Sequence, residues 1–437
     1  MKRLIVLMQL LFLFGGFFSL LEIGSQLLLA QEINYDEEKV TQFDLPNPLA
    51  MQDGSLILTA SDWTNKRRPE LLSLFKSEMF GQMPGVDRSK LKYETLLTET
   101  NIFEGKATRK QIRIFLNYPE ERPRLDLLVY IPNKATQPVP AFLGFNFQGN
   151  HTTTDDPAIL LTENADRTRN PNEDPETKRG IAKERWPFEM IINGGYAIAT
   201  GYYEDIDPDF DDGFNNGVHS LFSTEFPNKE NGDYPATITA WAWGLSRALD
   251  CLETIPEIDT QKVIVFGHSR LGKTALWAGA TEERFAAVIS NNSGCGGAAL
   301  SRREYGETVA RINKVFPHWF CQNFKKYGTD VNSLPFDQHE LIALIAPRPV
   351  YIASAEEDRW ADPRGEWLAA MNADIVYKLL GTEGILSCSW PELNQPIGKT
   401  IRYHIRTGKH NITEYDWQQY IKFADDFFRS EKRTEPE

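Results

Sequence analysis

The sequence predicts an α/β fold with a mostly parallel central sheet flanked by helices. Between residues 196 and 291, short apolar runs alternate with helical patterns, and this alternation is typical of parallel βαβ units. The elements expected there are strands 196–201, 262–266 and 286–291 and helices 235–253 and 271–280. An almost uninterrupted apolar run at 139–147 predicts a strand that is buried on both faces, at the centre of the sheet.

Further elements are expected on both sides of this central region. An amphipathic pattern predicts a helix at 64–80, and β-rich runs predict two strands before the central one, at 111–116 and 125–131. After residue 291 we expect strands 349–355 and 401–405 and helices 364–380 and 413–428.

Two irregular stretches, near 151–179 and 204–233, are too long for ordinary connections and are rich in polar residues. We expect them to be loop insertions around an active-site cleft. The second carries a run of closely spaced aspartates: Asp205, Asp207, Asp209, Asp211 and Asp212. A calcium loop would need a glycine and a terminal glutamate at fixed spacing, so the sequence favours a solvated acidic loop.

The N-terminus has the features of an export signal. A cationic start precedes an apolar run at 4–21 that Gly15 and Gly16 interrupt, which favours a signal peptide at 1–30 over a membrane anchor. We therefore expect a secreted or periplasmic protein with one catalytic domain at 31–437. A monomer is expected.

Charge and cysteine content narrow the possible partners. The net charge of −14 argues against nucleic-acid binding, which needs clustered cations. The four cysteines, Cys251, Cys295, Cys321 and Cys388, are sufficient for two disulfides in an oxidising compartment, and their pairing stays open. Their spacing does not resemble a zinc site, and we expect no metal.

The segment with the clearest chemistry joins the strand at 262–266 to the helix at 271–280. It reads Gly267-His268-Ser269-Arg270-Leu271-Gly272-Lys273. In the nucleophile elbow of α/β hydrolases, a sharp strand-to-helix turn exposes a serine and requires small neighbours. Leu271 stands where the usual pattern has its second glycine, so a serine that only caps the helix is the alternative. We expect an α/β-hydrolase fold with Ser269 as nucleophile.

A serine hydroxyl needs a histidine base, and that histidine needs an acid to orient it. In α/β hydrolases these follow the serine in the order acid, then histidine. The histidines after Ser269 are His318, His339, His404 and His410. His410 is the expected base, because it lies in a polar, glycine-containing loop between the last strand and the last helix.

The acid is expected just after the strand at 349–355. Asp358 is the preferred residue, and Glu356, Glu357 and Asp362 are neighbouring alternatives. Arg270 and Lys273 place two cations beside the serine, an arrangement suited to an oxyanion or to a polar sugar ring.

The elbow extended to Thr274-Ala275, together with Ser290-Asn291-Asn292-Ser293-Gly294-Cys295-Gly296-Gly297, resembles carbohydrate esterase family 15, the glucuronoyl esterases, and its bacterial branch most. The resemblance extends from about Trp63 to the C-terminus. It implies hydrolysis of the ester between 4-O-methyl-glucuronic acid of glucuronoxylan and a lignin alcohol, through an acyl-enzyme and without a metal or an organic cofactor.

The resemblance also implies roles for single residues. Ser269 would be the nucleophile, His410 the base, and Arg270 the stabiliser of the oxyanion through its guanidinium and backbone amide. Three further residues would hold the uronate ring: Lys273, Glu307 and Trp360.

The sequence departs from the family pattern at Asn292, where many members have the triad glutamate. An asparagine supplies no charge, so the resemblance to other bacterial members assigns the acid to Asp358. Two alternatives remain: an acetyl xylan esterase with the same triad, and a secreted binding protein with a hydrolase fold that lacks activity.

Overall fold

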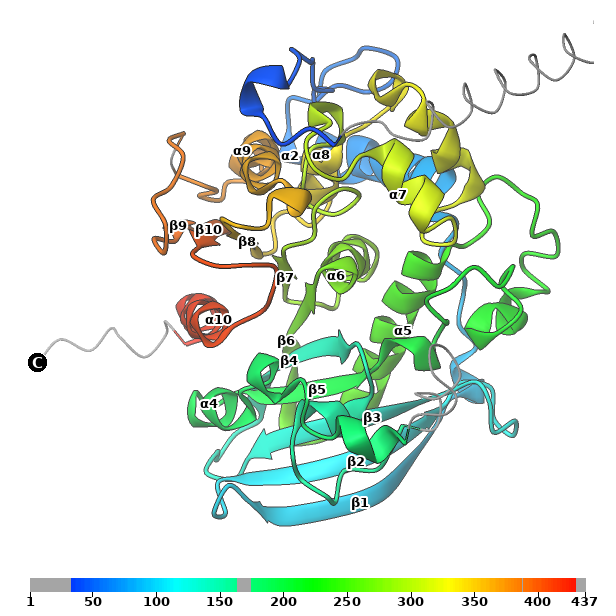
Figure 1. Cartoon of the computed structure of the whole chain (residues 1–437), viewed down its shortest axis with the longest axis vertical. Coiled ribbons are helices and arrows are strands. Elements are labelled where there is room, and N and C mark those ends of the chain that lie inside the picture. The colour runs from blue at the N-terminus through cyan, green and yellow to red at the C-terminus, as the bar shows by residue number, and fades with distance from the viewer. Residues whose placement is uncertain (1–32, 163–173, 387, 430–437) are drawn as a thin grey trace, which may run out of the picture.

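The structure is a computed structural model that describes residues 33–162, 174–386 and 388–429. Its described strands form a ten-stranded sheet in the order β1-β2-β3-β5-β4-β6-β7-β8-β10-β9 (Figure 1). The strands are β1 (Lys92–Ile102), β2 (Ala107–Phe115), β3 (Arg124–Pro132), β4 (Val139–Asn146), β5 (Ala197–Tyr202), β6 (Ile258–His268), β7 (Ala287–Asn291), β8 (Val350–Ala355), β9 (Ile397–Gly398) and β10 (Ile401–Arg406). Six neighbouring strands pair in parallel: β5, β4, β6, β7, β8 and β10. The other four, β1, β2, β3 and β9, are antiparallel to their neighbours.

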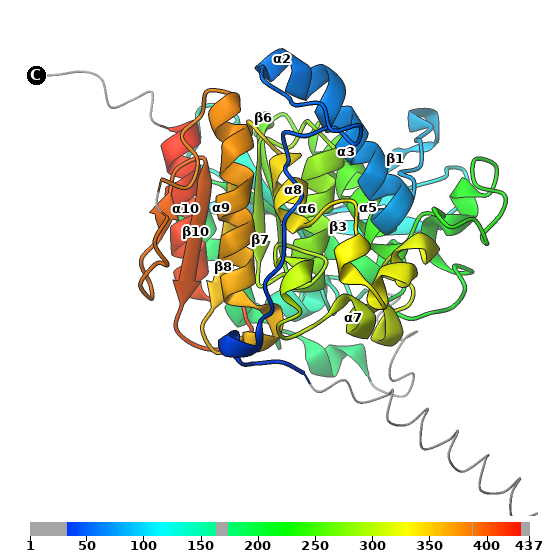
Figure 2. The same cartoon turned by 90° about the horizontal axis from the view of Figure 1, so that it is seen from above.

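Helices cover both faces of the sheet. They are α2 (Ala60–Asp62), α3 (Arg68–Phe75), α4 (Phe188–Asn193), α5 (Thr237–Leu252), α6 (Arg270–Thr281), α7 (Val309–Val315), α8 (Gln338–Ala343), α9 (Pro363–Leu379) and α10 (Glu414–Phe428). Helices α5, α6 and α9 lie on one face, and α4 and α10 lie on the other (Figures 1 and 2). The expected mostly parallel sheet with flanking helices is confirmed.

Two hydrophobic cores follow from the alternation of side chains along the central strands. In β4, Leu143 belongs to the core under α5 and α6, whereas Phe142 belongs to the core under α4 and α10. In β6, Val265 and Ile264 divide between the two cores in the same way. Because both faces are covered there, the buried parts of these strands are apolar, at 141–145 in β4 and 263–266 in β6.

The elements expected from the sequence are present, with ends shifted by a few residues. The helix expected at 64–80 is a helical stretch from α2 to Phe80, with π-helical turns at Trp63–Arg67 and Lys76–Phe80. Its Phe80 ring stacks on Trp277 of α6 at 4.3 Å between centroids. Strand β1 was not expected, because it is an edge strand whose side chains are mostly exposed and therefore show no apolar run.

The acidic stretch at 204–233 differs from the solvated loop expected. Asp205, Asp207 and Asp209 are buried. Asp207 accepts hydrogen bonds from His219 and Thr237, so this carboxylate is satisfied by protein donors rather than by water. The expectation of a solvated loop was therefore wrong for these three acids.

Other expectations concern what the described residues contain. In the stretches from 33 onward that the structure describes, no group of three or more His, Cys, Asp or Glu side chains is arranged to hold a metal ion. No helix in those stretches is long and apolar enough to cross a membrane. All four cysteines are described, and none is paired. The predicted signal peptide at 1–30 and part of the first insertion, 163–173, lie outside the described residues.

Candidate active site

Ser269 lies at a sharp turn between β6 and α6. Its backbone has φ 59° and ψ −128°, a conformation that residues with side chains rarely adopt. A Cβ at position 267 would overlap the Leu271 carbonyl oxygen, so Gly267 is required for the turn. At position 272 a Cβ would lie 3.0 Å from the Ser293 Cβ, so Gly272 permits close helix–strand packing one residue later than in the usual pattern. The Ser269 side chain caps no helix amide, so the helix-cap interpretation was wrong.

His410 and Asp358 come together at the end of the sheet where Ser269 lies. His410 Nδ1 is 2.5 Å from Asp358 Oδ2, and the carboxylate is 4% exposed. The His410 ring is 4.5 Å from the ring of His268, which directly precedes Ser269. Burial lowers the pKa of His268 well below its usual value, so this neighbour is neutral and does not repel an imidazolium at His410.

The alternative acids after β8 have other environments. Glu356 and Glu357 are exposed. Asp362 caps α9 by accepting a bond from the Gly365 amide and pairs with Arg303 at 2.8 Å. Asp358 is therefore the acid of this group that contacts His410.

Asn292 also contacts Asp358. Its Nδ2 donates to Asp358 Oδ2 at 2.8 Å, and its φ of 48° is a left-handed conformation that asparagine tolerates better than most residues. The Asn292 amide is uncharged, but its hydrogen bond holds the Asp358 carboxylate that orients His410.

Arg406 at the end of β10 holds the loop that carries His410. Its guanidinium donates to the carbonyl oxygens of Lys409 (3.1 Å) and Asn411 (2.6 Å), the residues on either side of His410. The same guanidinium is paired with the buried Asp416 at 2.8 Å. This pair was not predicted, because an arginine at a strand end and an acid in a helix carry no local signal of their contact.

Arg270 is fixed beside Ser269. It pairs with Asp209, and its guanidinium lies 4.9 Å from the Trp319 ring centroid. Burial alone would raise the pKa of Asp209, but hydrogen bonding from His318, the charge of Arg270 and a bond from Trp319 lower it to about 2. Arg270 Nε has no acceptor among the described residues and is itself buried, whereas the side chain as a whole is 22% exposed.

Lys273, Glu307 and Trp360 come from three segments and lie together. Lys273 Nζ is 3.8 Å from the Glu307 carboxylate, and both residues are buried. Burial raises the pKa of Glu307, against the opposing charge of Lys273. The Trp360 side chain bonds to the Glu307 carboxylate, and the Glu307 amide donates to the Trp360 carbonyl oxygen at 3.0 Å.

A buried carboxyl group, Glu366, supports this cluster and was also missed from the sequence. It accepts bonds from the amides of Ser293 (2.8 Å) and Gly294 (2.9 Å). The Ser293 carbonyl oxygen in turn accepts from Lys273 Nζ at 2.5 Å. Burial raises the pKa of Glu366 to about 8.

A serine at a strained strand-to-helix turn, followed along the chain by a buried acid and a histidine in contact with it, defines the class of the α/β-hydrolase enzymes. Comparison with known proteins identifies the family within this class. The family model "Glucuronyl esterase, fungi" matches residues 222–381.

Three similar proteins cover most of the chain. "Carbohydrate esterase MZ0003", from an unknown prokaryotic organism, is 50% identical over 400 residues, which are 90% of this chain and 91% of that protein. The structure of a promiscuous CE15 esterase from a marine bacterial metagenome has a TM-score of 0.84 at 49% identity and covers 90% of this chain and 99% of its own. The glucuronoyl esterase from Solibacter usitatus has a TM-score of 0.84 at 46% identity and covers 89% of this chain and 99% of its own.

The chain belongs to carbohydrate esterase family 15, the glucuronoyl esterases. The resemblance inferred from the elbow, the α/β-hydrolase fold and the assignment as a carboxylic ester hydrolase are thereby confirmed.

Proposed function

We propose that this esterase hydrolyses the ester between 4-O-methyl-glucuronate of glucuronoxylan and a lignin alcohol. The observation that carries the substrate class is the buried Lys273–Glu307 pair, with Trp360 bonded to it, next to the elbow. Removing a lysine and a glutamate from water costs several kcal/mol per ion. A uronate ring has hydroxyl groups to which Lys273 can donate and from which Glu307 can accept hydrogen bonds. Binding such a ring explains why this costly buried pair is present next to the elbow.

The proposed reaction assigns one role to each residue around Ser269. Ser269 Oγ attacks the uronate carbonyl carbon as His410 takes the hydroxyl proton, and Asp358 stabilises the imidazolium. The C–O bond to the alcohol breaks, and His410 gives the proton to the departing oxygen. Water then attacks the acyl-enzyme by the reverse path and releases the uronate and Ser269.

Arg270 is assigned to the oxyanion in both steps. Donors held in advance at the place where negative charge develops lower the barrier without reorganising. The pairing with Asp209 and the contact with Trp319 hold the partly exposed guanidinium in this way.

An acetyl ester is a less suitable substrate for the same residues. An acetyl group has no hydroxyl for Lys273 or Glu307 and no ring to lie against Trp360. The proposal of an inactive binding protein is also less suitable, because the contact between His410 and Asp358 at 2.5 Å is that of an oriented base.

The proposal extends to the chain as a whole. We place the activity outside the cytoplasm, since residues 1–30 have the pattern of a signal peptide. Residues 31–437 are proposed to act as one catalytic domain and as a monomer.

The test compares two esters with the same enzyme preparations. Wild type is expected to hydrolyse benzyl glucuronate with a kcat/KM at least about tenfold above that for an acetylated xyloside, and Ser269→Ala is expected to cleave neither. Lys273→Met is the discriminating variant, because it removes a uronate contact and leaves the triad. A preference for the acetyl ester, or loss of both activities in equal proportion in Lys273→Met, would contradict the proposed substrate class.

A further inference from the structure

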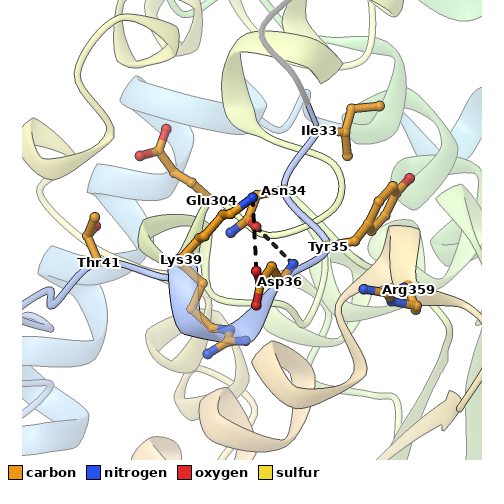
Figure 3. Close-up of a pocket in the computed structure, with 9 residues that line it drawn as sticks. Ile33, Asn34, Tyr35, Asp36, Lys39, Thr41, Glu304 and Arg359 are labelled. Carbon is orange, nitrogen blue, oxygen red and sulfur yellow. Dashed lines mark hydrogen bonds and ion pairs between the residues drawn. The ribbon is translucent and has the colours of Figure 1, made fainter.

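A cavity of about 440 Å³ that the proposed reaction does not use lies between the N-terminal segment 33–41 and the residues Glu304 and Arg359. Its volume falls in the range of about 300–1,000 Å³ that is usual for small-molecule sites. Figure 3 shows Asn34, Asp36 and Lys39 on the N-terminal segment, with Arg359 across from Lys39.

This cavity shares a wall with the proposed uronate site. Arg359 directly precedes Trp360, and the Trp360 carbonyl oxygen accepts from the Glu307 amide at 3.0 Å. Gly306, which directly precedes Glu307, donates its amide hydrogen to the Asn34 carbonyl oxygen at 2.8 Å. The backbone segments 306–307 and 359–360 therefore connect the lining of the cavity directly to two of the uronate residues.

The N-terminal segment is held in place by several contacts, so the cavity is formed in advance of any ligand. Arg303 donates to both oxygens of Glu37, at 2.8 and 3.0 Å. The Tyr305 hydroxyl donates to the Tyr35 carbonyl oxygen at 3.2 Å, and the two tyrosine rings meet edge to face at 6.1 Å.

The lining is polar and close to charge balance. Lys39 faces Asp36 at 4.0 Å, and Arg303, which also lines the cavity, is already paired with Glu37 and Asp362. Such a lining offers donors and acceptors together without a net charge to attract an ion. It favours a neutral ligand with several hydroxyl groups.

Arg359 and Tyr35 are the residues best placed to bind such a ligand. Arg359 Nε donates to the Tyr305 hydroxyl at 3.0 Å, and its guanidinium lies 5.1 Å from the Tyr35 ring centroid. Within residues 33–162, 174–386 and 388–429, no carboxylate lies within ion-pair distance of Arg359. Its remaining N–H groups are available as donors beside an aromatic ring, a combination suited to a sugar.

We propose that this cavity is a second saccharide subsite, which binds a neutral pentose unit of the xylan chain that carries the esterified uronate. This proposal rests on the proposed function, which sets the position of the xylan. A uronate held by Lys273 and Glu307 would place the attached glycan at the shared wall. Binding of the glycan then adds affinity without contributing to the chemical step.

The experiment compares a small ester with the same ester on a glycan. Steady-state rates are measured for benzyl glucuronate and for a benzyl ester of a glucuronoxylo-oligosaccharide. The variants are Arg359→Gln and Tyr35→Leu, and Arg364→Gln is the matched control, because Arg364 is an exposed arginine that contacts Glu37 at 3.4 Å but does not line the cavity. Binding of an unesterified xylo-oligosaccharide is measured separately by calorimetry.

Arg359→Gln and Tyr35→Leu are each expected to raise KM for the oligosaccharide ester about three- to tenfold, the size of one lost hydrogen bond or ring contact. The kcat for that ester and both constants for benzyl glucuronate should stay within about twofold, as should all constants of Arg364→Gln. The calorimetric affinity for the xylo-oligosaccharide should fall in the two cavity variants.

Equal effects on both esters, or unchanged oligosaccharide KM and affinity in both variants, would overturn the subsite. Wild type that binds the xylo-oligosaccharide in an Arg359-dependent way but cleaves no glucuronate ester would instead overturn the proposed function and leave the subsite standing.

Discussion

Replacing Asp358 by asparagine is expected to lower kcat/KM for a glucuronate ester about a thousandfold. The change keeps the size of the side chain and removes the charge that lies 2.5 Å from His410 Nδ1. His410 is 40% exposed, so an effective dielectric constant of about 20 applies to the pair. With charge centres about 4 Å apart, the lost attraction for the imidazolium is about 4 kcal/mol, and each 1.36 kcal/mol corresponds to a tenfold change in rate.

The assay is the hydrolysis of benzyl glucuronate followed by release of benzyl alcohol, with thermal unfolding measured on each variant. Glu356→Gln and Glu357→Gln are the matched controls, because they remove exposed acids from the same segment without touching His410. Both are expected to keep kcat/KM within about twofold. A loss below about tenfold in a folded Asp358→Asn variant, or a comparable loss in either control, would refute the assignment of the acid.

Three other predictions concern the residues that support the site. Arg406→Gln is expected to lower kcat about tenfold with little change in KM, because the loop that carries His410 loses two hydrogen bonds from the guanidinium. It is also expected to lower the free energy of unfolding by about 3 kcal/mol, because the buried Asp416 loses its arginine partner, although it keeps its hydrogen bonds from His404 and Thr413. An unchanged kcat in steady-state assays would contradict this. Lys273→Met is expected to lower kcat/KM for a glucuronate ester about 10- to 100-fold, the cost of a hydrogen bond to a charged group. Turnover of an acetyl ester should stay nearly unchanged. An equal loss of activity on both esters would contradict the role of Lys273 in binding the uronate. Burial raises the pKa of Glu366 to about 8, while the unfolded chain releases that proton near 4.5. The native state therefore holds a proton that the unfolded state has lost, and this contribution to stability, complete below about pH 4.5, should decline by about 1.4 kcal/mol per pH unit and be gone by about pH 8. Urea unfolding between pH 5 and 8 measures that slope, and a Glu366→Gln variant with the same slope as wild type would show that another group causes it.

The central strands and the candidate triad were accessible from the sequence for physical reasons. Strand segments covered on both faces must be apolar, so residues 141–145 of β4 and 263–266 of β6 are short apolar runs that can be recognised in the sequence. A strained turn leaves a local signature of small residues around Ser269. Chain order within the fold then restricts where His410 and Asp358 can lie.

Other features depend on contacts that sequence spacing does not reveal. The acids of the 204–233 stretch were expected in solvent, yet Asp209 accepts bonds from Trp319 and Tyr203 and pairs with Arg270. Two of these partners, Trp319 and Arg270, lie more than fifty residues away along the chain, so sequence spacing does not reveal the environment of the carboxylate. Glu366 is similar, because an acid near the start of a helix is most often a surface residue, and only the packing of α9 against the loop after β7 reveals its burial.

The most direct test of the central claim is the rate of benzyl glucuronate hydrolysis by wild type and by Ser269→Ala, measured side by side on folded protein. Wild type is expected to hydrolyse the ester, and Ser269→Ala is expected to lose at least about a thousandfold in rate, because the acyl-enzyme cannot form without the Ser269 hydroxyl. Equal rates in the two proteins, or no hydrolysis by wild type, would contradict it.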